Sequence, residues 1–186
     1  IYLGKLPTQT ISSIWRDLKV YKNHVYIVAD FKSSDSDLDK EHGVQVFDLS
    51  RLSSVTNPPE IFMADFVYKE HGKGHNIAIN EDSGYAYSLG TNTYSGGVHA
   101  INLANPKAPV FAGGFADAGY THDAQVVNYK GPDLDYTGKE IYIGSNEDKV
   151  VIIDVTDKKN IKTISTVEYS KTCLLYTSDA ADDTLC

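Results

Sequence analysis

Apolar and polar residues alternate along most of this chain, in short runs that turn residues separate. One phrase occurs three times, and each copy ends in Asp or Asn, a hydrophobic residue and a small residue: 43–50, 97–104 and 149–156. The Asp or Asn positions are 54 residues (102 − 48) and then 52 residues (154 − 102) apart. These runs are rich in Val, Ile and Tyr and predict β-strands. No window shows a sustained helical period.

The repeat extends on both sides of each phrase, so that every unit contains four expected strands. These are 14–21, 24–29, 43–49 and 60–67, then 75–80, 85–90, 97–103 and 109–115, then 122–128, 139–145, 149–155 and 161–168. A strand-only repeat of this length is typical of β-propeller blades. We therefore expect an all-β chain that forms a partial propeller of three four-stranded antiparallel blades, at 12–67, 68–116 and 117–170.

Both faces of the repeated strands are apolar. Alternation places Val44 and Val46 on one face of a strand, and Phe47 and Leu49 on the other. This pattern fits a sheet packed between two neighbouring sheets. The Asp or Asn of each phrase has a structural role in this prediction, because a short side chain accepts backbone N–H bonds at a turn. These residues are Asp48, Asn102 and Asp154.

The two ends of the chain depart from the repeat. Residues 1–11 are expected to be an outer strand that belongs to a preceding blade. Residues 171–186 are expected to be a non-native tail. The sequence from Cys173 onward has the residues that a translated sequencing-library adapter would give, so we expect 173–186 to be read-through in an assembled sequence and exclude it from the fold.

Composition narrows the classes of function. The chain has 17 Lys and Arg against 25 Asp and Glu, a net charge of −8. Without the three acidic residues of 173–186 it is −5 (17 − 22), which disfavours nucleic acid as a partner. No apolar run approaches the roughly 18 residues of a membrane span. Both cysteines lie in the suspected tail, so the repeats offer neither a disulfide framework nor a Cys-based metal site.

Several stretches resemble the LVIVD-repeat β-propellers, and more closely the bacterial choice-of-anchor B family. These stretches are 13–20, 42–49, 74–79, 120–125, 131–140, 145–148 and 153–157. The resemblance covers nearly all of residues 1–170. It implies a secreted or cell-surface protein, whose relatives carry differing C-terminal anchors. It implies no defined biochemical activity.

Polar pairs open the first strand of each unit, which is the innermost strand of a blade. They are Arg16 with Asp17, His75 with Asn76, and His122 with Asp123. A ring would bring such equivalent positions together around its axis, as a ligand site. Imidazole and carboxylate groups from His75, His122 and Asp123 could hold a divalent metal there. The alternative is that all six are polar residues that line the channel and bond to backbone and water.

An acidic loop offers a second possible cation site, for calcium. It places oxygen ligands at alternate positions, Asp35, Asp37, Asp39 and Glu41. Lys40 occupies the sixth position, where an EF-hand loop has glycine, so a solvated acidic loop remains the simpler interpretation. The stretch 71–75 resembles a phosphate-binding nest but lacks the spacing of a P-loop.

Two functions remain open at the level of sequence. The first is a non-enzymatic extracellular propeller that binds a protein or carbohydrate partner on one face of the ring, with Tyr94, Tyr120 and Tyr136 as candidate contacts. The second is a metal-dependent hydrolase with an axial ion at the His/Asp site. An enzyme would need at least three ligands around one point and a base within hydrogen-bond reach.

Overall fold

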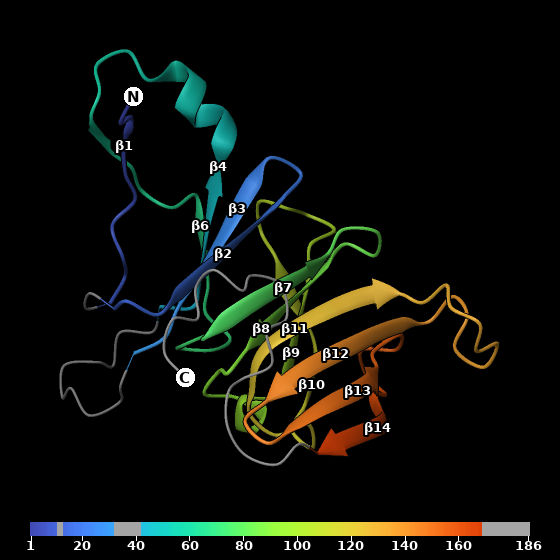
Figure 1. The fold of residues 1–186 in the computed structure, drawn as a ribbon. Helices are drawn as coiled ribbons and strands as arrows, with labels where there is room; N and C mark the ends of the chain where they lie inside the picture. Colours follow the sequence, from blue (N-terminus) through green and yellow to red (C-terminus); the bar gives the residue numbers. More distant parts are fainter. Residues whose placement is uncertain (11–12, 32–41, 169–186) are drawn as a thin grey trace.

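Three four-stranded antiparallel sheets follow one another along the chain (Figure 1). They are seen in a computed structural model that describes residues 1–10, 13–31 and 42–168. The first sheet contains β2 (Arg16–Tyr21), β3 (His24–Ala29), β4 (Val44–Asp48) and β6 (Phe66–Tyr68). The second contains β7 (Asn76–Asn80), β8 (Tyr85–Leu89), β9 (Val98–Asn102) and β10 (Val110–Phe115). The third contains β11 (Thr121–Asn128), β12 (Glu140–Asn146), β13 (Lys149–Asp154) and β14 (Lys162–Glu168).

The prediction of an all-β chain of antiparallel four-stranded sheets is confirmed. Each sheet is open and pairs its strands in chain order, because short turns join antiparallel neighbours. The helical turns of the described residues are two short 3₁₀ segments, η1 (Leu49–Ser54) and η2 (Tyr94–Gly96). Within those residues no helix has the length and apolar character to cross a membrane.

The first strands of the three sheets lie beside one another. Strand β7 contacts both β2 and β11, so the first strand of the second sheet lies between the first strands of its neighbours. The strands open outward from this row, and η1 and β14 lie at opposite ends of the molecule (Figure 1). The residues that begin these three strands are therefore gathered in one region.

The core consists of apolar layers between neighbouring sheets. Val44 and Val46 of the first sheet pack with Ile77 and Ile101 of the second. Phe47 points the other way and packs with Val25 and Phe62 on the outer face of the first sheet, as alternation along β4 predicts. A further layer joins the second and third sheets, and its fully buried residues include Tyr87, Leu89, Tyr142 and Ile153.

A buried ion pair of the third unit contacts side chains of the second unit and so links the two sheets. Lys158 Nζ lies 2.7 Å from Glu140 Oε2, and both side chains are less than a tenth exposed. From the second sheet, Asn80 Nδ2 donates to Glu140 Oε1 at 2.9 Å and Ser83 Oγ donates to the same oxygen at 2.6 Å. The Lys158 ammonium also lies 3.9 Å from the ring centre of Tyr85. The carboxylate thus has the several partners that a buried charge requires.

The Asp or Asn of each repeated phrase caps the turn that follows it. The backbone N–H of the residue two positions later donates to each side chain: Ser50 to Asp48 at 2.9 Å, Ala104 to Asn102 at 2.7 Å, and Thr156 to Asp154 at 3.0 Å. This is the structural role that the sequence predicts, and the same local bond recurs in all three units.

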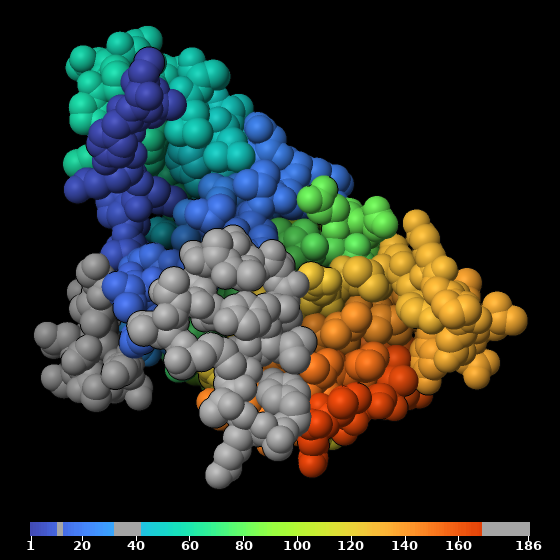
Figure 2. Space-filling view, in the orientation of Figure 1, coloured from blue at the N-terminus to red at the C-terminus, as the bar shows by residue number. Residues whose placement is uncertain are grey.

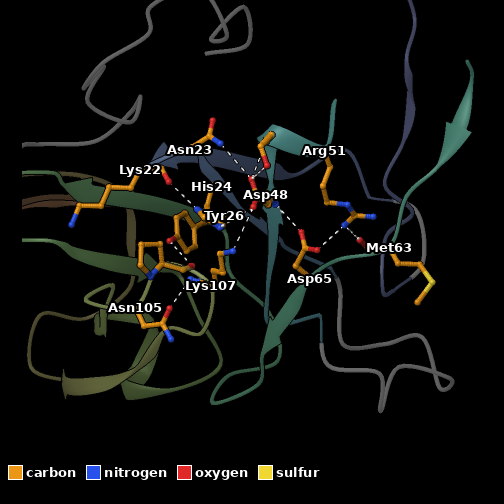
Figure 3. Close-up of polar contacts among 12 residues, drawn as sticks. Lys22, Asn23, His24, Tyr26, Asp48, Arg51, Met63, Asp65, Asn105 and Lys107 are labelled. Atoms are coloured by element: carbon orange, nitrogen blue, oxygen red, sulfur yellow. Dashed lines mark hydrogen bonds and ion pairs between the residues drawn. The ribbon is translucent and has the colours of Figure 1, made fainter. Parts of the chain in front are cut away.

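The expected strand over 60–67 is wrong. Residues Glu60–Ile61 form β5, which pairs in parallel with β1 (Gly4–Lys5), and the fourth strand of the first sheet is Phe66–Tyr68. The segment between them is held by the backbone of β4 and by a side chain of η1. Asp48 N–H donates to Asp65 Oδ2 at 2.7 Å, and Arg51 Nη1 donates to Asp65 Oδ1 at 2.8 Å and to the Met63 carbonyl at 2.9 Å (Figure 3). These contacts interrupt the strand.

The same region touches the second sheet. The Tyr26 hydroxyl donates to the Pro106 carbonyl at 2.8 Å, and Lys107 Nζ lies 3.9 Å from Asp48 Oδ2 (Figure 3). Both Pro106 and Lys107 belong to the turn between β9 and β10. Turns as well as apolar side chains therefore fix the first sheet against the second.

Two predicted features lie outside the described residues. They are the acidic loop with Asp35, Asp37, Asp39 and Glu41, and the suspected tail of residues 171–186.

Candidate functional site

His75 and His122 lie together where β7 and β11 begin. We call β2, β7 and β11, the first strands of the three sheets, the inner strands. The distance from His122 Nδ1 to His75 Nε2 is 3.4 Å. The two ring centres are 5.0 Å apart, and the ring planes are nearly perpendicular. The side chains are 24% and 20% exposed, so both can be reached from solvent while protein surrounds most of each ring.

Local backbone features aim the two imidazoles at each other. Strands β11 and β12 pair Thr121 with Asn146 but Asp123 with Ser145, so His122 is an extra residue at a bulge. A bulge re-aims the side chain that it carries. Gly90, in the left-handed region at φ 57°, leaves space for the His75 side chain. A Cβ atom at Gly90 would come within 2.6 Å of the His75 Cβ.

A carboxylate faces the remaining nitrogen of each imidazole. Asp30 Oδ2 lies 2.9 Å from His75 Nδ1, and Glu147 Oε1 lies 3.6 Å from His122 Nε2. Lys73 Nζ lies 3.3 Å from the other oxygen of Asp30. The axial cluster, as we call this group, consists of Asp30, Lys73, His75, Tyr120, His122 and Glu147.

The surroundings shift several pKa values within the axial cluster. Burial alone would raise the pKa of Asp30, but the hydrogen bond with His75 and the Lys73 ammonium outweigh it and hold that pKa below its usual value. Burial, and then the neighbouring His75, lower the pKa of His122. Burial raises the pKa of Tyr120 to about 12. At neutral pH the cluster therefore contains a charged Asp30 and a neutral His122.

Arg16, the expected counterpart of the two histidines, bonds to residues of the N-terminal segment. Its Nε donates to the Ser13 carbonyl at 3.0 Å, and its Nη2 donates to Thr8 Oγ1 at 2.9 Å. Burial lowers the pKa of the Arg16 guanidinium. The guanidinium thus ties the start of β2 to Thr8 and Ser13.

The second member of each predicted pair bonds to the backbone of an inner strand. Asn76 Oδ1 accepts the Ile77 N–H at 2.7 Å, and Asp123 Oδ1 accepts the Ala124 N–H at 2.7 Å. Asp17 Oδ2 also accepts the Ile77 N–H, at 3.2 Å, which crosses from the first sheet to the second. Across residues 1–10, 13–31 and 42–168, no three His, Cys, Asp or Glu side chains form a group that could hold a metal ion, so the set His75, His122 and Asp123 is not assembled there.

Sequence reasoning missed Asp30 and Glu147. A signal for them exists, because each is the residue directly after the second strand of its unit, β3 or β12. Gly90 holds the same position after β8 in the middle unit. Antiparallel pairing returns the end of the second strand to the start of the first, so these positions lie beside the inner-strand openings. Alignment of the histidines alone does not indicate that Asp30 and Glu147 lie beside them.

Three further histidines form a buried cluster between the first and second sheets. His42, His71 and His99 are each no more than 2% exposed. The rings of His71 and His99 are 4.9 Å apart. His99 Nε2 lies 2.7 Å from the Tyr68 hydroxyl, and His71 Nε2 lies 3.0 Å from Ser88 Oγ. Burial lowers the pKa of His71 to about 3 and that of His99 to about 4, so these rings are neutral packing groups at neutral pH.

Comparison with known proteins adds no relative: no family model matches the chain, and no curated protein or solved structure matches it significantly.

Proposed function

We propose that this chain is part of a β-propeller of the LVIVD-repeat, choice-of-anchor B type, and that it binds a ligand or partner at the axial cluster without catalysing a reaction. The observation that carries the proposal is the convergence of two imidazoles, 3.4 Å apart, from equivalent positions on neighbouring inner strands. Repetition of one strand position around an axis is how a propeller gathers side chains at one point.

The chemistry of the axial cluster suits recognition of a polar partner. It combines acceptors on Asp30 and Glu147, a donor on Lys73 and the Tyr120 ring, whose centre is 4.9 Å from that of His122. Aromatic and charged groups side by side are typical of surfaces that bind carbohydrate or peptide. The extracellular or cell-surface location belongs to the same proposal and rests on the resemblance to the family.

The second candidate, a metal-dependent hydrolase, has less support from the geometry. Such an enzyme needs several protein ligands around one point and a base placed to act on substrate. Asp123, the third expected ligand, accepts the Ala124 N–H. The axial cluster offers recognition groups more readily than a catalytic set.

The test is retention of the 186-residue chain on arrays of immobilised surface glycans and peptides. Wild type is compared with Lys73→Gln/Glu147→Gln, which removes one donor from a partly buried position and one carboxylate from an exposed position. Glu81→Gln, in the turn at the far end of β7, is the matched control. We expect wild type and the control to be retained by the same spots, and the double variant to lose them.

Three results would contradict this proposal. The double variant could be retained as well as wild type, or wild type could bind no spot. Alternatively, the chain could turn over a chromogenic ester, phosphate or glycoside in a reaction that the double variant loses.

A further inference from the structure

The hydrogen-bonding pattern of the axial cluster leaves two nitrogen lone pairs facing each other. A carboxylate only accepts hydrogen bonds, so Asp30, 2.9 Å away, favours a proton on His75 Nδ1. The Glu147 carboxylate lies 3.6 Å from His122 Nε2, and its charge favours the proton on that nitrogen. A neutral imidazole carries one N–H. His75 Nε2 and His122 Nδ1 then both present lone pairs, across a gap of 3.4 Å.

This gap has the width expected between two ligands of one metal ion. Nitrogens bound at 2.0–2.1 Å to a tetrahedral Zn²⁺ lie roughly 3.3–3.4 Å apart. Hydrogen bonds between nitrogen and oxygen or nitrogen acceptors are usually shorter, about 2.7–3.2 Å. The 3.4 Å separation is at the long end of the range for a hydrogen bond and matches the spacing of two ligands on a shared cation.

We infer that the axial cluster binds one divalent transition-metal ion of the Zn²⁺ class, through His75 Nε2 and His122 Nδ1. This inference deepens the proposed function, on which it rests, by naming a ligand of the same site. Asp30 is a positioning residue, because its carboxylate holds the His75 imidazole by the other nitrogen. Glu147 adds negative charge 3.6 Å from the other nitrogen of His122. A carboxylate in that place fixes the tautomer and the ring orientation of a metal-binding histidine.

The class of metal follows from the donor atoms. Imidazole nitrogen suits Zn²⁺, Ni²⁺ and Cu²⁺, whereas Mg²⁺ and Ca²⁺ prefer oxygen ligands. The Asp30 and Glu147 carboxylates add two negative charges against the one positive charge of Lys73, a balance that favours a cation. Two protein ligands leave further coordination positions for water or for a donor atom of a bound partner.

The experiment is a calorimetric titration of the full-length chain with ZnCl₂ at pH 7.5, after metal removal with EDTA. All proteins carry Cys173→Ser and Cys186→Ser, because the two thiolates would compete for Zn²⁺. The variants are His75→Gln, His122→Gln, their combination and Asp30→Asn, with circular dichroism to verify folding. His24→Gln is the matched control, since its ring lies at the opposite end of β3. MgCl₂ is the matched control ion.

We expect one Zn²⁺ per chain and no response to Mg²⁺. Each single histidine variant should bind at least tenfold more weakly. Asp30→Asn should lose about 10–100-fold in affinity, as loss of such a supporting carboxylate typically does. The His24→Gln control should bind as the parent chain does.

Two outcomes overturn the inference: no Zn²⁺ uptake by the parent chain, or unchanged uptake by the combined histidine variant. Failure of the metal site is distinguishable from failure of the proposed function. If array binding depends on Lys73 and Glu147 but the chain takes up no Zn²⁺, the metal site is refuted and the proposed function stands. If the chain takes up Zn²⁺ but binds no array spot, partner binding is refuted and the metal site stands.

Discussion

At the scale of single residues, the same imidazole group serves two purposes in this chain, according to its surroundings. His42, His71 and His99 are enclosed between two sheets. His75 and His122 lie at strand openings that solvent reaches, with a carboxylate on one nitrogen of each. Burial makes the first group structural, whereas exposure and paired carboxylates make the second group available to a ligand.

The buried histidines predict a loss of stability in mild acid. The pKa of His71 falls to about 3 and that of His99 to about 4 on folding, below the ordinary value near 6.5. The unfolded chain then binds protons more readily than the folded chain. The free energy of unfolding should be highest above about pH 6.5. As the pH drops further, it should decrease by up to about 1.4 kcal/mol per pH unit for each histidine. The fall should level off near the folded pKa values.

Urea unfolding at several pH values between 7.5 and 5 measures this effect. His99→Gln removes one titrating group and keeps polar atoms that can reach Tyr68 and Thr93, so its stability should fall less steeply than that of wild type. Carboxylates with lowered pKa values act mainly below this range. A wild-type midpoint that stays constant from pH 7.5 to 5 would contradict the prediction.

At the scale of elements, the turn that follows the third strand of each unit depends on one side chain. Asn102 Oδ1 accepts the Ala104 N–H at 2.7 Å, as Asp48 and Asp154 do in the other units. Asn102→Ala should therefore lower the free energy of unfolding by about 1 kcal/mol, the usual cost of one lost hydrogen bond. Asn102→Asp keeps the acceptor and should cost less. Chemical denaturation of the two variants checks this, and equal midpoints would refute the assigned role.

Most strands could be predicted from the sequence because their alternation is local. The predicted and observed bounds of the inner strands β7 and β11 agree to within one residue. The error at 60–67 has a tertiary cause, since Arg51 and Asp65 bond across the segment and interrupt it. No local pattern encodes that contact.

The candidate site was predictable only in part, for a similar reason. The repeat aligned His75 with His122, and the structure places them together. Arg16, aligned with them, instead bonds to Ser13 and Thr8, because its longer side chain reaches the N-terminal segment. Asp30 and Glu147 enter the cluster through strand pairing, which only the register reveals.

At the scale of the whole molecule, the sheets at the two ends of the row have one face without a neighbouring four-stranded sheet among the described residues. The third sheet is the yellow-to-red region of Figure 2. Its exposed Val127, Ile143 and Val167 share one face of the sheet in the strand register. On the first sheet, Leu18 and Val20 are about half exposed. In the proposed propeller, neighbouring blades cover these faces.

The chain of residues 1–186 should consequently self-associate through the outer face of the third sheet. Apolar patches of this kind mark interaction surfaces or association hazards. Ile143→Lys/Val167→Lys should shift the chain toward monomer in light scattering. Leu134→Lys, in the exposed β11–β12 turn, is the control and should change nothing. A wild-type chain that is monomeric at all concentrations would refute this.

The most direct test of the site is a long-range ¹H–¹⁵N spectrum of the six imidazoles at neutral pH, before and after one equivalent of Zn²⁺. In the free chain, His75 should carry its proton on Nδ1 and His122 on Nε2, the nitrogens that face Asp30 and Glu147. Zn²⁺ should then shift His75 Nε2 and His122 Nδ1 and leave the other four rings unchanged. Opposite tautomers, or Zn²⁺ shifts at other histidines, would contradict the account.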